Sequence, residues 1–422
     1  MKKLTTWVKS NWLIVVMCVL ILVAPPAFYV GANAWNKKIQ TSRQAEVKSD
    51  WDKLARAPVT YSAPTALPGE QAIEVRRVPH AQVTAYFKEL RERRANQIAE
   101  VVALALERNE GERHVLVEEL LPTPPERNDQ VLRLAMQKRV VGTATEPSAI
   151  EVMLTDLNAG RPPDAEDLGT LLGEFRAGEF EKYEAEFGVA EMTKEKEKEL
   201  NEALVKRRIG EYQRRASELT VYADPSVMPT NIPRAEEGLP DIVDCFLWQW
   251  DLWVVQDVLE GIERANMSAT GERSSVPEAP VKRILRLETL RAPGVFKDGP
   301  QIRAVSGSGP LIATDPSTSV TGRVSHDTNQ LYDVRPVTLS LIVSSERILE
   351  VLDAISTTNF MSVIDLDLSR VDPWDDLRQG YYYGDEHVVR LDLTIETIWL
   401  RRWLKDYMPP TVKSLMKVKD DA

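Results

Sequence analysis

Cysteine and histidine are scarce in this chain of 422 residues. The two cysteines, Cys18 and Cys245, lie far apart, and Cys18 falls inside an uncharged apolar run. This placement excludes a disulfide framework, so the fold must be stabilised by packing. The four histidines (His80, His114, His326 and His387) show no ligand spacing and are expected on the surface or in loops rather than at a metal.

An excess of positive charge is also missing. The chain has 53 Lys+Arg against 64 Asp+Glu, for a net charge of −11. Nucleic-acid binding draws most of its affinity from neutralising phosphates, and no block of Lys and Arg flanked by aromatic residues is present. We therefore expect no nucleic-acid partner.

Catalytic and phosphate-binding motifs are absent from the sequence. There is no G-x-S-x-G, H-E-x-x-H, Walker A or G-x-G-x-x-G pattern. The GSGP at 307–310 is followed by no Lys-Ser/Thr and is expected to be part of a flexible connector over 292–329. We expect no enzyme, no cofactor and no metal.

One acidic arrangement leaves a minor alternative open. Asp365, Asp367, Asp392 and Glu396 alternate with apolar residues, which places them on the outer face of a sheet. Carboxylates grouped in this way can hold a divalent cation and serve an envelope enzyme. Alternation alone also explains them, because it turns polar residues outward, and we favour that explanation.

The only long uncharged run is NWLIVVMCVLILVAPPAFYVGANAW, residues 11–35. About 20 apolar residues suffice to cross a bilayer, and Trp12 and Trp35 would lie at its two interfaces. A signal peptide cleaved after Ala34 is the alternative, because Ala32-Asn33-Ala34 resembles a cleavage site; a buried soluble helix is the third. We favour a retained anchor over 12–35 with tail 1–11 in the cytoplasm, and we expect Pro25 and Pro26 to break its helix near the far side of the membrane.

The remainder divides by proline content and helical periodicity. We expect a linker (36–80), a helical stalk (81–221) with an inserted region (109–173), a second linker (222–240), an α/β domain (241–405) and a C-terminal tail (406–422). Within these, helices are predicted over 81–107, 130–140, 167–219 and 241–266.

A coiled-coil seam is predicted near the end of the stalk. Apolar or small side chains recur in steps of 4, 3, 4 and 3, the spacing of a helix that packs against a partner helix. A surface helix packed on its own domain is the alternative. The seam consists of Val205, Ile209, Tyr212, Ala216 and Leu219.

A cluster of tryptophans supports a competing function. Trp248, Trp250 and Trp253 lie within one predicted helix whose apolar stripe runs from Val243 to Ala265. We favour core packing for them. As a ligand-stacking platform, alone or with the 292–334 loops, they would instead indicate an envelope-exposed ligand-binding or surface interaction protein.

Apolar and polar residues alternate most clearly in the last third of the sequence. RPVTLSLIV (335–343), SVIDLDLSRV (362–371) and HVVRLDLTIETIWL (387–400) predict half-buried strands, and the stretch between the first two predicts a helix. Ile364, Leu366 and Leu368 are expected to face inward.

This stretch resembles the PilO family of type IV pilus assembly proteins and the related GspM-type proteins of type II secretion. The resemblance covers 337–400 well and 241–290 loosely, and implies an α+β fold: one transmembrane helix, a helical stalk and a ferredoxin-like domain with duplicated halves. It further implies a non-enzymatic scaffold of a bacterial inner membrane with its C-terminal domain in the periplasm. Expected partners are a second copy or a PilN-like bitopic protein, with other pilus or secretion components.

Overall fold

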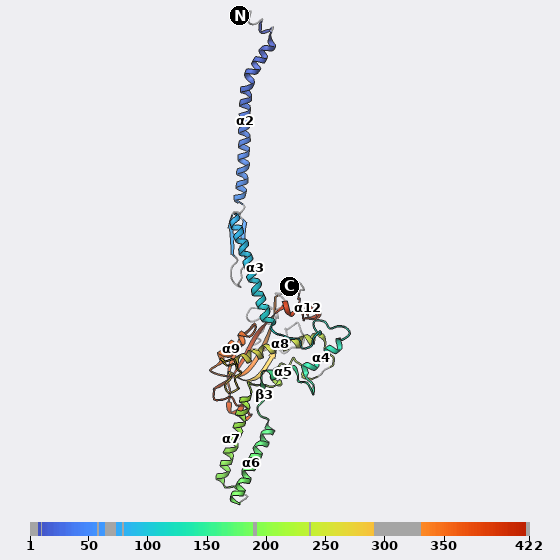
Figure 1. The fold of residues 1–422 in the computed structure, drawn as a ribbon, viewed down its shortest axis with the longest axis vertical. Coiled ribbons are helices and arrows are strands. Elements are labelled where there is room, and N and C mark those ends of the chain that lie inside the picture. The colour runs from blue at the N-terminus through green and yellow to red at the C-terminus, as the bar shows by residue number, and fades with distance from the viewer. Residues whose placement is uncertain are drawn as a thin grey trace. The chain divides into compact units, whose positions relative to one another are not determined.

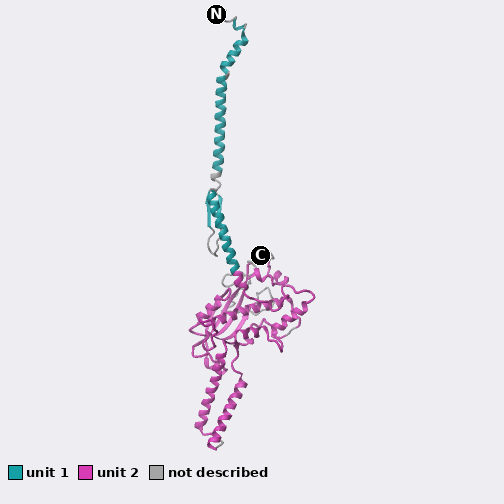
Figure 2. Ribbon diagram, in the orientation of Figure 1, with its two compact units in different colours: residues 1–104 teal, residues 105–422 magenta. Residues whose placement is uncertain are grey.

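The computed structural model describes residues 7–9, 11–56, 59–63, 73–77, 80–188, 192–235, 238–290 and 331–418. The chain forms two compact units, residues 1–104 and 105–422 (Figure 2). The expected α+β class is confirmed, with a long apolar helix near the N-terminus, a helical middle and a mixed sheet of six strands with helices. Both cysteines are free. The predicted connector 292–329 lies outside the described residues. The helices predicted over 81–107, 130–140 and 241–266 and the three predicted C-terminal strands are present, with small differences in their bounds.

Helix α2 (Trp12–Arg56) dominates unit 1. Its 45 residues span about 67 Å at ~1.5 Å per residue. Pro25 and Pro26 lie inside it, so the predicted end of the helix near these prolines is wrong; proline is tolerated in helices that cross membranes, where neighbouring groups satisfy the freed carbonyls. Among the described residues, α2 alone is long and apolar enough to cross a membrane, and a signal sequence would meet the same criterion.

A β-hairpin follows, in the stretch 36–80 that was expected to be a linker. Strands β1 (Val59–Ala63) and β2 (Ile73–Arg77) pair antiparallel and pack on helix α3 (Ala81–Glu110). The Tyr61 ring stacks on Phe87 at 5.2 Å between centroids, and its hydroxyl lies 3.0 Å from that of Thr84. This small core explains why the proline-rich stretch has defined strands.

The sheet of unit 2 has the order β3-β4-β5-β6-β8-β7. Neighbours are parallel from β3 to β5 and antiparallel from β5 to β7. The strands are β3 (Ala159–Gly160), β4 (Val221–Tyr222), β5 (Val281–Thr289), β6 (Tyr332–Ser344), β7 (Met361–Arg370) and β8 (Val388–Leu400).

Two α-β-β repeats build the larger part of this sheet. The first is helix α8 (Ile242–Ala265) with β5 and β6; the second is α9 (Ile348–Thr357) with β7 and β8. The second strands of the repeats, β6 and β8, pair at the centre, and α8 and α9 pack against each other (Figure 1). The repeated order agrees with the predicted duplicated halves.

The apolar stripe predicted for α8 is buried, and so is most of the rest of this helix. The sheet, α9 and the two short helices α4 (Asp129–Val141) and α5 (Ala149–Asp156) surround it and form one core with it. The inserted region therefore supplies part of the core.

Strand β7 is the edge strand of the sheet, and a bulge between Val363 and Asp365, at Ile364, shifts its register against β8. Leu366 and Leu368 lie opposite the core residues Leu393 and Leu391, so they are on the predicted inner face of the sheet. They are nevertheless 39% and 48% exposed. Alternation predicts the face of a side chain but not whether a neighbour covers it at the edge of a sheet.

Two segments expected as linker and tail also contribute to the core. Stretch 222–240 holds the short helix η1 (Pro225–Val227) and buries Met228 and Ile232. Beyond α10 (Pro373–Arg378) and α11 (Arg401–Leu404), helix α12 (Pro410–Leu415) buries Val412 in the core. Both segments were expected to lie outside the domain, but isolated apolar side chains attach them to its core.

The helix predicted over 167–219 is a hairpin of two helices, α6 (Ala165–Phe187) and α7 (Lys194–Glu218), extending away from the sheet (Figure 1). Gly188 ends α6 with a φ of 66°, a conformation that favours glycine. At the base, the Thr220 amide donates to the Asn158 carbonyl at 3.1 Å and Ala223 to Gly160 at 3.0 Å. A Cβ at Gly160 would lie 2.8 Å from a methyl group of Leu219 and 2.9 Å from the Arg215 guanidinium, so a larger residue there would have to displace these two side chains.

Candidate functional site

The five seam residues divide into two groups. Tyr212, Ala216 and Leu219 are buried within the chain, and the latter two join a cluster with Tyr222 and Ile342. Val205 is 57% exposed and Ile209 is half-buried, both towards the outer part of α7. Only this second pair is accessible for a contact with another molecule.

The tryptophan cluster belongs to the core. Trp250 and Trp253 are each 1% exposed, and Trp248 is half-buried against the same core. The Trp253 indole donates a hydrogen bond to the His114 carbonyl at 3.1 Å. A ligand has no access to these two rings, so the ligand-stacking hypothesis is wrong; the 292–334 loops that it also invoked lie almost entirely outside the described residues.

The acidic residues of the strands differ in burial and in their partners, although Asp367 and Asp392 lie opposite each other on β7 and β8. Asp392 is buried and accepts hydrogen bonds from Ser340 and from Arg390, whose Nε lies 2.8 Å from it. Glu396 is buried as well, whereas Asp367 is exposed. Across the part of the chain that the structure describes, no three His, Cys, Asp or Glu residues are grouped so as to hold a metal ion.

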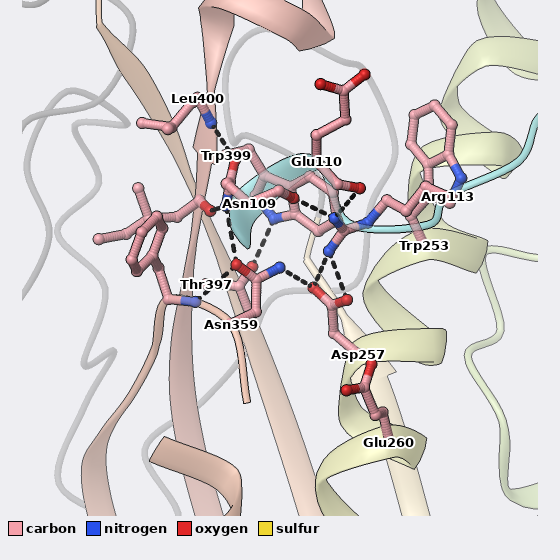
Figure 3. A network of polar contacts seen from close by, with 12 residues as sticks. Asn109, Glu110, Arg113, Trp253, Asp257, Glu260, Asn359, Thr397, Trp399 and Leu400 are labelled. Carbon is pink, nitrogen blue, oxygen red and sulfur yellow. Dashed lines mark hydrogen bonds and ion pairs between the residues drawn. The ribbon is translucent and has the colours of Figure 1, made fainter. Parts of the chain in front are cut away.

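A buried polar network lies instead where α3 ends, and we call it the α3 junction. It was not singled out by the sequence. It consists of Asn109, Arg113, Asp257, Asn359, Trp399 and Trp403, brought together from α3, α8, the α9–β7 turn, β8 and α11 (Figure 3). All of these residues belong to unit 2.

Asn109 lies at its centre, with no exposed surface. Its amide nitrogen donates to the Ile398 carbonyl at 2.8 Å and to the Asn359 side chain at 3.0 Å. Its amide oxygen accepts from the Leu400 backbone N–H at 2.7 Å and from the Trp403 indole at 2.8 Å. The side chain thereby uses both donors and both lone pairs, which fixes its position and orientation.

Arg113 closes the end of α3. Its guanidinium donates to the carbonyl of Glu110, at 2.7 Å, and to that of Asn109, carbonyls that the helix itself leaves unpaired. The same group lies over the Trp399 ring, 4.8 Å from the centroid, an arrangement that adds cation–π attraction.

The ion pair of Arg113 with Asp257 joins this helix end to α8. One guanidinium nitrogen lies 2.5 and 2.7 Å from the two carboxylate oxygens, and both side chains are buried. Asn359 donates to the same carboxylate at 2.8 Å. Burial raises the pKa of Asp257 to about 6, against the opposing effect of the Arg113 charge.

Two further buried ion pairs tie the same core together. Arg335 on β6 pairs with Asp251 on α8, and Arg401 on α11 pairs with Asp333 through two hydrogen bonds of 2.7 and 2.9 Å. Removing one member of such a pair is costly, because the other charge is left in the interior.

The α3 junction does structural work, not chemistry. Its polar groups bond to one another. What it can do is hold the last turn of α3 in one position against α8, β8 and α11. Periodicity gave no sign of it, because Asn109 and Arg113 lie in a polar stretch and their partners follow far along the chain.

Together these observations define an α+β protein with a long apolar N-terminal helix and a domain of repeated α-β-β units that holds the last turn of α3. No protein-family model and no curated protein matches the chain. Among solved structures, the type 4 fimbrial biogenesis protein PilO from Pseudomonas aeruginosa is similar to part of it, at 15% identity and a TM-score of 0.14. The likeness covers 17% of this chain and 47% of that one, about half its length.

Proposed function

We propose that this chain is a non-enzymatic scaffold of a bacterial inner membrane, anchored by α2, with its C-terminal domain in the periplasm. Its role is to hold parts of a type IV pilus or type II secretion-like assembly machine in fixed positions. It acts as a dimer or together with a PilN-like bitopic protein.

The α3 junction is the observation that carries the scaffold proposal. A scaffold that transmits force from a membrane to a domain needs the end of the connecting helix to be held rigidly by that domain. Asn109 and the Arg113–Asp257 pair hold the last turn of α3 by hydrogen bonds that are directional and shielded from water.

The membrane part of the proposal rests on α2. Its apolar first half has the length that a bilayer requires, and Lys37, Lys38 and Arg43 follow the apolar run on the same helix. The pilus or secretion setting rests on the resemblance of 337–400 noted in the sequence, with which the repeated α-β-β order is consistent.

Complementation in the native bacterium tests this function. Deleting the gene is expected to abolish surface pili or type II secretion, and the full-length chain is expected to restore them. Residues 35–422 exported behind a cleavable signal peptide should fail, since the domain would be detached from the membrane.

The matched control places the same residues 35–422 behind an unrelated single span, which should restore function. If the released form restores assembly as well as the anchored form, the scaffold proposal is wrong. It is equally wrong if the deletion leaves both pili and secretion unchanged.

A further inference from the structure

A groove on unit 2, which we call the α5–α8 groove, is not used by the α3 junction. It has a volume of about 770 Å³ and lies between α5 and α8, with the end of α4 and the loop before α5 closing one side. Each of the two helices turns one face towards it: Ala149, Val152, Met153 and Asp156 from α5, and Gln256, Leu259, Glu260 and Glu263 from α8.

The lining residues of both helices follow the spacing i, i+3, i+4 and i+7, so each wall is about two turns or 10 Å long. The floor is apolar, with Leu157 and Leu259 buried and Val152 44% exposed. A groove with an apolar floor between two helices is complementary in shape to the apolar face of a short helix, which a flat surface is not.

The rim carries charge of mainly one sign. Four carboxylates (Glu146, Asp156, Glu260 and Glu263) face a single guanidinium, Arg139. Glu260 and Glu263 pair with Arg264 and Arg273 on the surface. Glu146 and Asp156 form no ion pair with any residue that the structure describes.

We propose that the α5–α8 groove binds a short amphipathic helix of a partner protein, with two or three aliphatic side chains on one face and Lys or Arg beside them. The aliphatic side chains occupy the floor over Leu259 and Met153. The basic side chains pair with Asp156 and Glu146 on one rim and approach Glu260 on the other, which fixes the orientation of the helix. The proposal rests on this geometry alone and is independent of the pilus or secretion assignment.

The occupant is not a second copy of the groove, because two acidic rims would repel each other. The inserted region that forms α4 and α5 also supplies the groove, which gives this region a role in addition to closing the core.

The test uses the full-length chain in nanodiscs of zwitterionic lipid, so that a basic probe is not drawn to the membrane. The probe is a fluorescent 14-residue helical peptide with leucines at i, i+3 and i+7 and lysines on the flanks. Its twin has glutamates in place of the lysines. Binding is followed by fluorescence anisotropy, and a photo-crosslinking leucine analogue locates the peptide by mass spectrometry.

We expect the lysine peptide to crosslink to α5 and α8 and the glutamate peptide not to bind. Replacing two rim carboxylates, Asp156→Lys with Glu260→Lys, should lower the affinity for the lysine peptide by about tenfold or more. The loss of close charge pairs across an interface has an effect of this size. The matched control, Glu174→Lys with Glu181→Lys, makes the same charge change on exposed positions of α6 and should leave binding unchanged.

Three outcomes would overturn the proposal. They are equal affinity of the groove and control variants for the lysine peptide, crosslinks located outside the groove, and no binding of either peptide to the wild-type chain. Crosslinks between two protein molecules at α5 would also overturn it, in favour of self-association.

Discussion

At the scale of single residues, the strongest constraints come from polar side chains rather than from the apolar core. With its one side chain, Asn109 connects α3 to β8, to α11 and to the turn before β7. A hydrophobic side chain of the same size would fill the space but leave the N–H of Leu400 and the indole N–H of Trp403 without acceptors. Buried donors of this kind are expensive to leave unpaired.

Asn109→Ala should therefore lower the free energy of unfolding of unit 2 by about 2–4 kcal/mol, as expected when several buried polar groups lose their partners. Chemical denaturation of the full-length chain, followed by tryptophan fluorescence, measures the change. Asn201→Ala on the exposed side of α7 is the control and should have almost no effect. Equal stability of the two variants would contradict the role given to Asn109.

Asp257 makes stability depend on pH. Its folded-state pKa, raised by burial from 3.8 to about 6, means that the folded protein takes up a proton more readily than the unfolded chain. The resulting stabilisation is fully present below pH 3.8 and is lost as the pH rises through about 6. It amounts to at most about 3 kcal/mol, at ~1.4 kcal/mol per pKa unit.

The Asp257→Asn variant carries an amide in place of this carboxyl group and has no titrating group at this position. The advantage in unfolding free energy of the wild type over this variant is expected to grow as the pH falls from 7 to 4. Denaturation curves at several pH values measure it. A difference between the two proteins that stays constant with pH would show that Asp257 does not titrate as the structure indicates.

The sequence predicted some of these residues well and others not at all. Trp250 and Trp253 were expected in the core because they fall on an apolar helical stripe, and they are buried there. Asn109 and Arg113 could not be recognised, because an isolated polar residue in a polar stretch looks exposed until its distant partners are known. Asp392 was expected to be an outward-facing residue of the sheet, but it is buried and accepts hydrogen bonds from Ser340 and from the exposed Arg390.

At the scale of elements, helix α7 has two different halves. Its C-terminal half uses Tyr212 and Ala216 to pack against its own domain, while Val205 and Ile209 remain accessible further out. The heptad pattern ran through both halves, since periodicity records that a face is apolar and not what covers it. The proposed dimer contact is therefore carried by the outer half and its neighbours on the hairpin.

Val205→Lys with Ile209→Lys should shift the full-length protein in detergent from dimer to monomer in sedimentation experiments. Burial of a lysine at an apolar helix contact disfavours association, and both positions are accessible enough that folding should be unaffected. Ser217→Lys, exposed on the same helix but outside the surface that Val205 and Ile209 share with Gln213, is the control. If the double variant keeps the mass of the wild type, the α7 seam is not the dimer contact.

Helix α5, with only eight residues, depends on its cap. Ser148 accepts a hydrogen bond from the Glu151 backbone N–H at 3.2 Å, and the Glu151 carboxylate accepts in return from the Ser148 backbone N–H at 2.7 Å. This second bond holds the pKa of Glu151 below its usual value. The pattern S-x-x-E before an apolar run was readable in the sequence, although the helix was not predicted.

Ser148→Ala should weaken the first turn of α5 by about 1 kcal/mol. Faster hydrogen exchange at the amides of residues 150–152 is the expected result. Thr193→Ala, which removes the cap of α7 instead, should leave these amides unchanged and speed exchange at the start of α7. Identical exchange patterns in the two variants would contradict the assignment of the cap.

At the scale of the whole chain, the fate of the N-terminal helix decides where the protein resides. The structure extends α2 well past the apolar run, so the alanines at 32 and 34 lie within a continuous helix. We expect that the segment is retained. Intact-mass measurement of the protein extracted from membranes should give a chain that includes residues 1–34.

Leu20→Arg provides a second measurement, because an arginine near the centre of a span costs about 2.5–3.5 kcal/mol of insertion free energy. The fraction of protein that resists carbonate extraction should fall, whereas Gln40→Arg, beyond the apolar run, should not change it. A mature chain that begins at Trp35 would mean that the segment is a signal peptide.

The architecture as a whole was only partly predictable. The fold class and the individual helices and strands follow from hydrophobic periodicity and composition, whereas the duplicated halves were expected only from the resemblance of 337–400 and 241–290 to a known family. The break at Gly188 and the attachment of Val412 to the core depend on single residues that no periodic pattern marks. Proline content suggested linkers at 36–80 and 222–240, yet buried side chains attach both stretches to a core, Tyr61 in the first and Met228 and Ile232 in the second.

The base of the α6–α7 hairpin has a consequence for how such proteins diverge. The chain leaves the sheet at Gly160 and returns at Val221, and the two points are joined by hydrogen bonds. The outer part of the hairpin, beyond the segment of α7 from Tyr212 to Leu219 that packs on the domain, can lengthen or shorten without moving a strand. Each insertion of seven residues in both helices would extend the arm by about 10 Å. The hairpin is thus an adjustable spacer, and relatives with the same sheet can differ in reach by steps of whole heptads.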